Sequence, residues 1–129
     1  MDWNDRQSHD KEELFAALPI ARETSNLFAR IEQAVHDSPR KVVVLDDDPT
    51  GTQTVHGIDV FTGWEIEDLR RAFLSEAKLF FILTNSRSLE TEQARVVTEE
   101  IALNLCQVAR ETGIDFDVIS RSDSTLRGH

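Results

Sequence analysis

The sequence has almost no cysteine: Cys106 is the only one among 129 residues, and there is no tyrosine. One cysteine cannot form an internal disulfide, and a chain of this length buries roughly two thirds of its unfolded surface, so a hydrophobic core can hold the fold. The four histidines and the cysteine show no zinc-like spacing. Cys106 follows Leu105 on the apolar stripe of a predicted helix, which predicts a small buried side chain and not a nucleophile.

Positive charge is also scarce. Lys and Arg number 14 against 24 Asp and Glu, which gives a formal net charge of -10. A nucleic-acid binder, or a protein that seeks anionic lipid, needs clustered basic residues, so we expect neither partner. A small anionic ligand is compatible with this charge, because a few basic residues can outweigh the net charge around a site.

Long apolar runs are missing as well. No run approaches the roughly 20 residues of a membrane-spanning helix, and the first residues contain no basic segment that leads into an apolar one. We therefore expect a cytoplasmic protein. With 40% hydrophobic and 29% charged residues, five glycines and three prolines, the composition is that of one globular domain.

Residues 1–40 are predicted to form an N-terminal helical extension. A short helix over residues 11–18 follows Asp10, a helix-capping residue, and ends at Pro19. A second helix is indicated by apolar residues that recur at helical spacing, namely Leu27, Phe28, Ile31, Ala34 and Val35.

From residue 41 the pattern changes to α/β. Apolar runs typical of strands cover residues 42–45, 58–62, 79–83 and 116–119. Two amphipathic helices lie between them, with stripes at Ile66, Leu69, Phe73 and Ala77, and at Ala94, Val97, Ile101, Leu105 and Val108. We predict a mostly parallel, Rossmann-like sheet with helices on both faces over residues 41–129. It would be incomplete at its C-terminal end, and an unpaired edge favours association into homo-oligomers.

Polar segments follow three of the predicted strands, at residues 46–54, 84–88 and 120–129. Ligands bind at the carboxyl ends of parallel strands, so we expect these segments to share one crevice. Asp, Ser and Thr at such places also serve ordinary turns and helix caps. The three consecutive carboxylates that begin at Asp46 repel one another, which favours a cation or a hydrogen-bonding ligand nearby. The candidate ligand-binding residues are Asp46, Asp47, Thr50, Gly51, Asn85, Ser86, Arg87, Arg121, Ser122, Asp123, Ser124 and Arg127.

The first polar segment resembles the nucleophile motif of haloacid-dehalogenase-type phosphatases. A strand followed by Asp46-x-Asp48-x-Thr50 implies that Asp46 attacks phosphorus and that Asp48 acts as acid and base. Thr84 would hold the phosphoryl group beside a magnesium ion. The match is partial, because the segment after the fourth strand supplies one acid and a basic residue where these enzymes carry an acidic pair.

Three longer segments, residues 45–57, 84–89 and 120–129, resemble the N-terminal domain of the four-carbon acid sugar kinase family in order, spacing and strand context. The resemblance implies an ATP-dependent kinase for sugar acids such as threonate, erythronate or their oxo forms. In that family the N-terminal domain holds the sugar acid, and ATP and Mg²⁺ are bound mainly by a separate C-terminal domain. This chain then looks like a truncated piece, inactive alone, and a binding or effector fragment is the remaining alternative.

A four-carbon sugar acid offers one carboxylate and several hydroxyls. Arg121 or Arg127 can pair with the carboxylate, since guanidinium groups bind carboxylates with two parallel hydrogen bonds. The hydroxyls would be held by Asp46, Asp47, Asn85 and Asp123. Phosphoryl transfer needs a carboxylate that orients or deprotonates the reacting hydroxyl, and Asp47 and Asp123 are the catalytic candidates. No residue of this chain is assigned as a metal ligand.

Overall fold

The structure is a computed structural model that describes residues 10–20 and 24–122. The candidates Asp123, Ser124 and Arg127 lie outside these residues. Contacts divide the chain into two compact units, residues 1–34 and 35–129, whereas the sequence pattern placed the division after residue 40.

The helices near the N-terminus begin where the sequence predicts. Helix α1 (Lys11–Ala16) is capped by Asp10, whose Oδ1 accepts hydrogen bonds from the backbone N–H groups of Glu12 at 2.8 Å and Glu13 at 3.2 Å. Helix α2 (Leu27–Asp37) runs across the division between the units. Neither helix contains a buried residue, and apolar side chains such as Phe15 and Phe28 are exposed.

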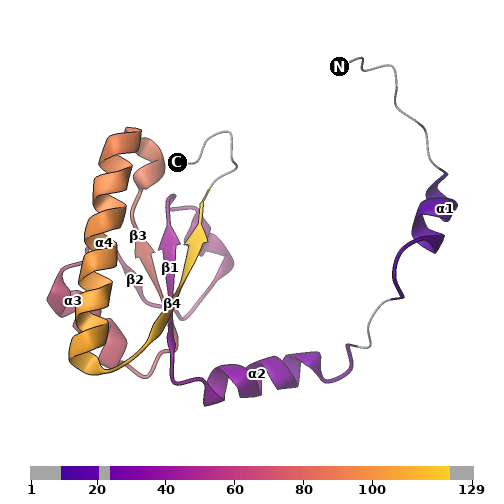
Figure 1. Ribbon diagram of the computed structural model, residues 1–129, viewed down its shortest axis with the longest axis horizontal. Coiled ribbons are helices and arrows are strands. Elements are labelled where there is room, and N and C mark those ends of the chain that lie inside the picture. Colours follow the sequence, from indigo (N-terminus) through magenta and orange to yellow (C-terminus); the bar gives the residue numbers. More distant parts are fainter. Residues whose placement is uncertain (1–9, 21–23, 123–129) are drawn as a thin grey trace. The chain divides into compact units, whose positions relative to one another are not determined.

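The second unit contains a four-stranded sheet in which every pairing is parallel (Figure 1). Its strands are β1 (Lys41–Asp46), β2 (Val60–Phe61), β3 (Leu79–Leu83) and β4 (Phe116–Arg121), in the order β2-β3-β1-β4. The predicted α/β class and parallel sheet are confirmed. Strand β2 is shorter than the predicted run of residues 58–62.

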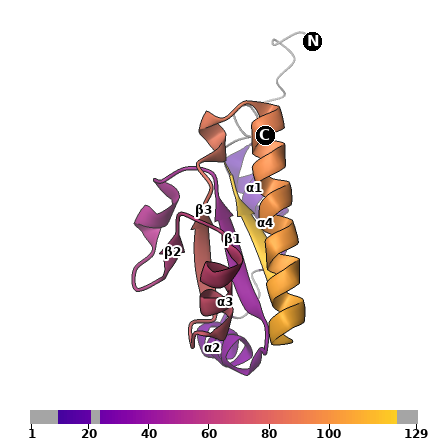
Figure 2. The same cartoon turned by 90° about the vertical axis from the view of Figure 1, so that its left-hand side faces the viewer.

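Two helices, α3 (Ile66–Leu74) and α4 (Thr91–Thr112), pack against one another and against one face of the sheet. Side chains alternate along a strand, so Val43, Phe80 and Ile82 point to this face. They form the core with Leu69, Ala72, Phe73, Ile101, Leu105 and Val108. Figure 1 shows both helices on the same side of the sheet, and Figure 2 shows the long α4 running alongside it.

The opposite face is crossed by the connection between β1 and β2, which contains the 3₁₀ turn η1 (Gly51–Thr54). Crossovers between parallel strands are right-handed. The β2–α3–β3 and β3–α4–β4 connections step along the sheet in one direction, whereas the β1–β2 connection steps the other way. The two α-helices of the described sheet region therefore share a face, and an irregular connection covers the other.

The predicted apolar stripe of α4 is buried at Ala94, Ile101, Leu105 and Val108. The predicted burial of Cys106 was wrong, because its side chain is exposed. Consecutive helix residues lie about 100° apart, which turns Cys106 away from the face that buries Leu105. Of the helices in the described residues, none has the length and apolar character needed to cross a membrane. A cytoplasmic location stays a prediction.

Candidate functional site

The carboxyl ends of β1, β3 and β4 are joined by backbone hydrogen bonds. The amide of Thr84 donates to the carbonyl of Asp46 at 2.8 Å, and the amide of Arg87 donates to the carbonyl of Asp47 at 3.3 Å. On the other side, the Asp47 amide donates to the carbonyl of Arg121 at 3.3 Å. The described parts of the three polar segments therefore share one rim, as the sequence predicts.

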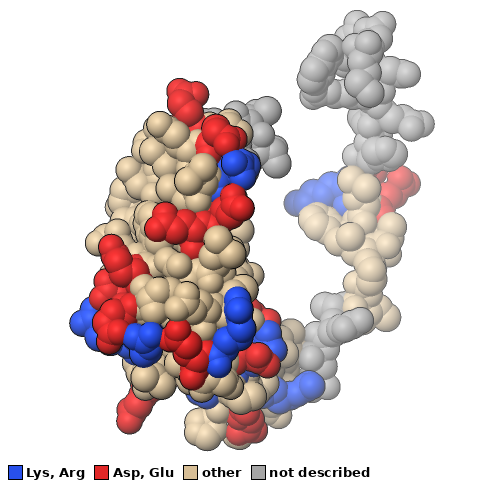
Figure 3. Space-filling view, turned by 60° about the vertical axis from the view of Figure 1, so that its left-hand side comes forward, with Lys and Arg blue, Asp and Glu red and all other residues tan. Residues whose placement is uncertain are grey.

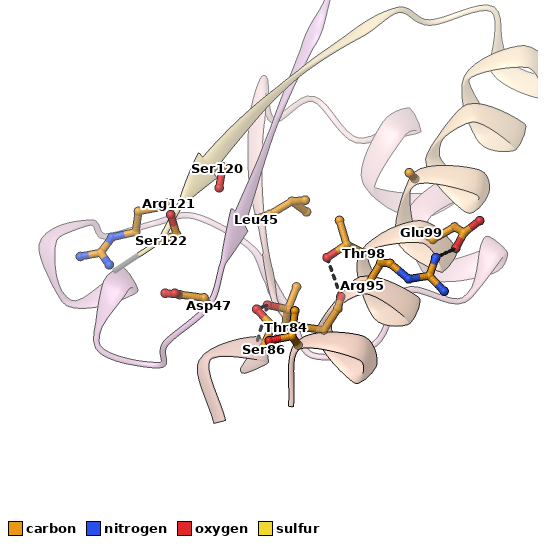
Figure 4. Close-up of a pocket in the computed structure, with 13 residues that line it drawn as sticks. Leu45, Asp47, Thr84, Ser86, Arg95, Thr98, Glu99, Ser120, Arg121 and Ser122 are labelled. Atoms are coloured by element: carbon orange, nitrogen blue, oxygen red, sulfur yellow. Dashed lines mark hydrogen bonds and ion pairs between the residues drawn. The ribbon is translucent and has the colours of Figure 1, made fainter. Parts of the chain in front are cut away.

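A pocket of about 610 Å³ opens at this rim, on the face that carries α4. Its strand-end wall is formed by Asp47, Thr84, Ser86, Ser120, Arg121 and Ser122. The facing wall belongs to the first half of α4 and includes Arg95 and Glu99, which pair with each other at 2.8 Å. Figure 4 shows Leu45 between these two walls. The pocket thus combines hydroxyls, two carboxylates and two guanidinium groups around an apolar floor.

Asp46 lies beneath the rim and not in the pocket. Its side chain has 0% exposure, and its Oδ1 accepts a hydrogen bond from the Asp48 amide at 3.3 Å. The Arg121 guanidinium is 3.8 Å from the same oxygen. Its Oδ2 accepts no hydrogen bond from the described residues, and the backbone of Gly51 packs against the carboxylate. Burial raises the pKa of Asp46, against the opposing effects of the Asp48 amide and Arg121.

Asp48 is held by Thr50 and Arg87. Its Oδ1 accepts hydrogen bonds from the backbone N–H of Thr50 at 2.7 Å and from the Thr50 hydroxyl at 2.5 Å. Its Oδ2 accepts from Nη1 of Arg87 at 2.6 Å. The hydrogen bonds from Thr50 lower the pKa of Asp48 most, and Arg87 adds to the effect. Asp48 therefore stays ionised in a pair that bridges the β1 and β3 loops.

The β3 loop turns sharply at Asn85, whose φ of 51° places it in the left-handed region. Asparagine is one of the few residues other than glycine that adopts this conformation readily. The turn is followed by the 3₁₀ helix η2 (Ser86–Ser88), and the Thr84 hydroxyl donates to the Ser86 hydroxyl at 3.0 Å. This local geometry brings the side chains of Thr84 and Ser86 to the pocket wall.

Among the described candidates, four line the pocket: Asp47, Ser86, Arg121 and Ser122. The other five do not line it: Asp46, Thr50, Gly51, Asn85 and Arg87. Sequence reasoning missed the contribution of α4, especially Arg95, Thr98 and Glu99. A usable signal was present, because a helix that follows a parallel strand begins at the carboxyl edge of the sheet and its first turns border the crevice.

The electrostatics of the helix-covered side follow the acidic composition. Figure 3 shows that acidic side chains predominate in this view and that the basic ones lie beside them. Arg95 pairs with Glu92 at 2.7 Å, and Arg70 pairs with Glu111 at 2.6 Å. In the described part of the chain, no three His, Cys, Asp or Glu side chains are grouped so that they could hold a metal ion.

Comparison with protein families matches residues 42–129 to the sugar-binding N-terminal domain family. The chain belongs to this family, which forms the N-terminal domain of four-carbon acid sugar kinases. The match covers the sheet, both of its helices and the three polar segments. Neither the curated proteins nor the solved structures provide a match.

Proposed function

We propose that this chain is the substrate-binding portion of an ATP-dependent kinase that phosphorylates four-carbon sugar acids of the threonate, erythronate or oxo-tetronate type. One observation carries the proposal: in a chain of the sugar-binding family, two arginines, several hydroxyls and two carboxylates line one pocket at the carboxyl ends of parallel strands. This set matches a ligand with one carboxylate and several hydroxyls.

Each polar group has a distinct task in this proposal. Arg121 binds the ligand carboxylate through charge-assisted hydrogen bonds. Ser86 and Ser122 bind ligand hydroxyls, and Asp47 accepts a hydrogen bond from the hydroxyl that reacts. Asp47 therefore stays a candidate base, together with Asp123 outside the described residues. Fixing the hydroxyl in one orientation lowers the entropic part of the barrier to phosphoryl transfer.

The phosphoryl group would come from ATP with Mg²⁺, held mainly by a separate domain. The polar groups that line the pocket suit the sugar acid in this division. In this proposal the described pocket binds the sugar acid, and the nucleotide-binding domain supplies the phosphoryl donor.

The phosphatase alternative requires the Asp46 carboxylate to attack phosphorus. That carboxylate has 0% exposure and lies against the backbone of Gly51. A nucleophile must reach the reacting atom, so its burial favours the kinase proposal over the phosphatase. Turnover of phosphate esters without ATP would reverse this preference.

The proposal is tested by titrating the chain with threonate and with erythronate while binding is monitored by NMR. Erythritol, which has the same number of carbons but lacks the carboxylate, is the control ligand. We expect weak sugar-acid binding that Arg121→Gln reduces about tenfold or more, because a hydrogen-bonded charge pair is lost. Arg110→Gln is the matched control, since the exposed Arg110 side chain bonds to the carbonyl of Cys106 in the second half of α4. Equal sugar-acid affinity in wild type and Arg121→Gln would remove the carboxylate anchor.

Phosphoryl transfer is tested separately, in a protein that joins this chain to the nucleotide-binding domain. ADP release with magnesium is measured over tetronates, neutral sugars and phosphate esters. The proposal requires turnover with a tetronate and ATP, and turnover confined to neutral sugars would refute the substrate class.

A further inference from the structure

Arg87 stands out because it lies beside the pocket and is already engaged. Its Nη1 donates to Oδ2 of Asp48 at 2.6 Å, and the two side chains are 34% and 19% exposed. Neither Asp48 nor Arg87 is among the described residues that line the pocket, although their sequence neighbours Asp47 and Ser86 both line it. The sequence marked Arg87 as a candidate ligand-binding residue, but in the structure its guanidinium is paired with Asp48 and does not line the pocket.

The pair joins two loops that are also connected by two backbone hydrogen bonds and by the Thr84 hydroxyl, which donates to the carbonyl of Asp46 at 3.0 Å. Asp48 fixes the β1 loop on one side through the amide and hydroxyl of Thr50. Arg87 fixes the β3 loop on the other, where its own amide donates to the carbonyl of Asp47. One ion pair therefore constrains both segments from which Asp47 and Ser86 reach the pocket.

The charge pattern supports the same function. Asp46, Asp47 and Asp48 are consecutive carboxylates that repel one another. Arg121 lies 3.8 Å from Asp46, whereas Arg87 contacts Asp48 directly. Because Arg87 neutralises the charge of Asp48, the repulsion among the three carboxylates is reduced and Arg121 can remain at the pocket wall.

We propose that Asp48 and Arg87 form a clasp that positions Asp47 and Ser86 for the sugar acid, and that Arg87 acts through this clasp without touching the substrate. The assignment rests on the proposed function for the identity of the ligand. It makes Arg87 a positioning residue and leaves Arg121 as the anion ligand of the described pocket.

The two roles of Arg87 predict different ligand selectivity. A positioning residue supports the groups that bind hydroxyls, so Arg87→Gln should weaken threonate and erythritol binding by a similar factor, about tenfold. A direct anion ligand would weaken threonate alone. Asp48→Asn should reproduce the effect of Arg87→Gln, and the double variant should be no weaker than either single one, because each opens the same clasp. Arg87→Lys, which keeps a cation near Asp48, should restore part of the affinity.

Amide hydrogen exchange tests the clasp without any ligand. In Arg87→Gln and in Asp48→Asn, exchange at Thr50 and at position 87 should accelerate by about tenfold relative to wild type, while the core amide of Val43 stays protected. Arg110→Gln should leave all three amides unchanged. If exchange also rises at Val43, the milder Arg87→Lys variant is used for the same comparison.

The outcomes separate the two proposals. Absence of sugar-acid binding by the wild-type chain refutes the proposed function, and exchange then decides the clasp alone. Unchanged exchange at Thr50 and position 87 in both variants overturns the clasp. A loss of threonate binding with intact erythritol binding in Arg87→Gln also overturns it, because that pattern belongs to a direct anion contact.

Discussion

Replacing Gly51 with alanine tests how the rim is built. A Cβ atom at this position would lie 1.9 Å from Oδ2 and 2.2 Å from Oδ1 of Asp46. Asp46 is fully buried, so its carboxylate has no free space into which it can turn. Gly51 itself is buried and lies outside the left-handed region, which among the described glycines is occupied by Gly57 and Gly113. The requirement for glycine here is therefore close approach and not backbone conformation.

Two effects oppose each other in this variant. Overpacking a closely packed site costs about 1–3 kcal/mol. Alanine reduces the entropy of the unfolded chain, which returns about 0.4–1 kcal/mol where the backbone conformation suits it. The contact distances lie far below normal van der Waals separation, so the upper part of the cost applies. We expect Gly51→Ala to lower the free energy of unfolding by about 2 kcal/mol, or the Tm by about 8 °C for a chain of this size.

Thermal and urea unfolding measure the effect, and a second substitution isolates its cause. Because the three atoms nearest to the added Cβ all belong to the Asp46 carboxylate, Gly51→Ala should cost much less in an Asp46→Ala background. Gly57→Ala is the control, since its Cβ meets no atom within 4 Å and its cost comes only from a φ of +66°. An equal loss from Gly51→Ala with and without the Asp46 carboxylate would refute the reasoning.

Two further predictions concern the same rim. Burial raises the pKa of Asp46, so the stability contributed by this carboxyl is present below its ordinary pKa and is lost as the pH rises through the raised value. In urea unfolding measured from acid to neutral pH, Asp46→Asn should therefore gain stability relative to wild type as the pH rises. A constant difference between the two proteins would contradict the assignment. At Asn85, with φ of 51°, alanine should cost about 1 kcal/mol while glycine stays close to wild type, and equal thermal shifts for the two variants would argue against backbone strain.

The positions of the strands and of the long helix follow from local pattern. The run from Val42 to Leu45 is apolar at every residue, as expected of a strand covered on both faces, and it forms β1. The spacing of Ala94, Ile101, Leu105 and Val108 predicts one buried face of α4. The shared rim was also predictable, because parallel strands bring their carboxyl ends to one edge.

The individual tasks of the polar residues were not predictable in the same way. Asp46 and Asp47 are adjacent aspartates, yet Asp46 is buried against the backbone of Gly51, whereas Asp47 lines the pocket. Arg87 and Arg121 both lie at the carboxyl ends of strands, but Arg87 is paired with Asp48, whereas Arg121 is among the residues that line the pocket. The position of α4 after a parallel strand indicates that its first turns border the crevice, but which of its side chains line the pocket depends on how the helix packs across the sheet.

The strands and helices of this chain are determined by spacings of a few residues, because side-chain periodicity and backbone preference act locally. The sequence also carries the motifs that identify the family to which residues 42–129 belong. Which charged side chain is buried, which are paired with one another and which line the pocket is decided only when β1, β3, β4 and α4 come together. Burial and charge pairing are properties of neighbours in space, and the neighbours of Asp46, Asp48 and Arg87 come from distant parts of the sequence or from the fold of the connecting loop.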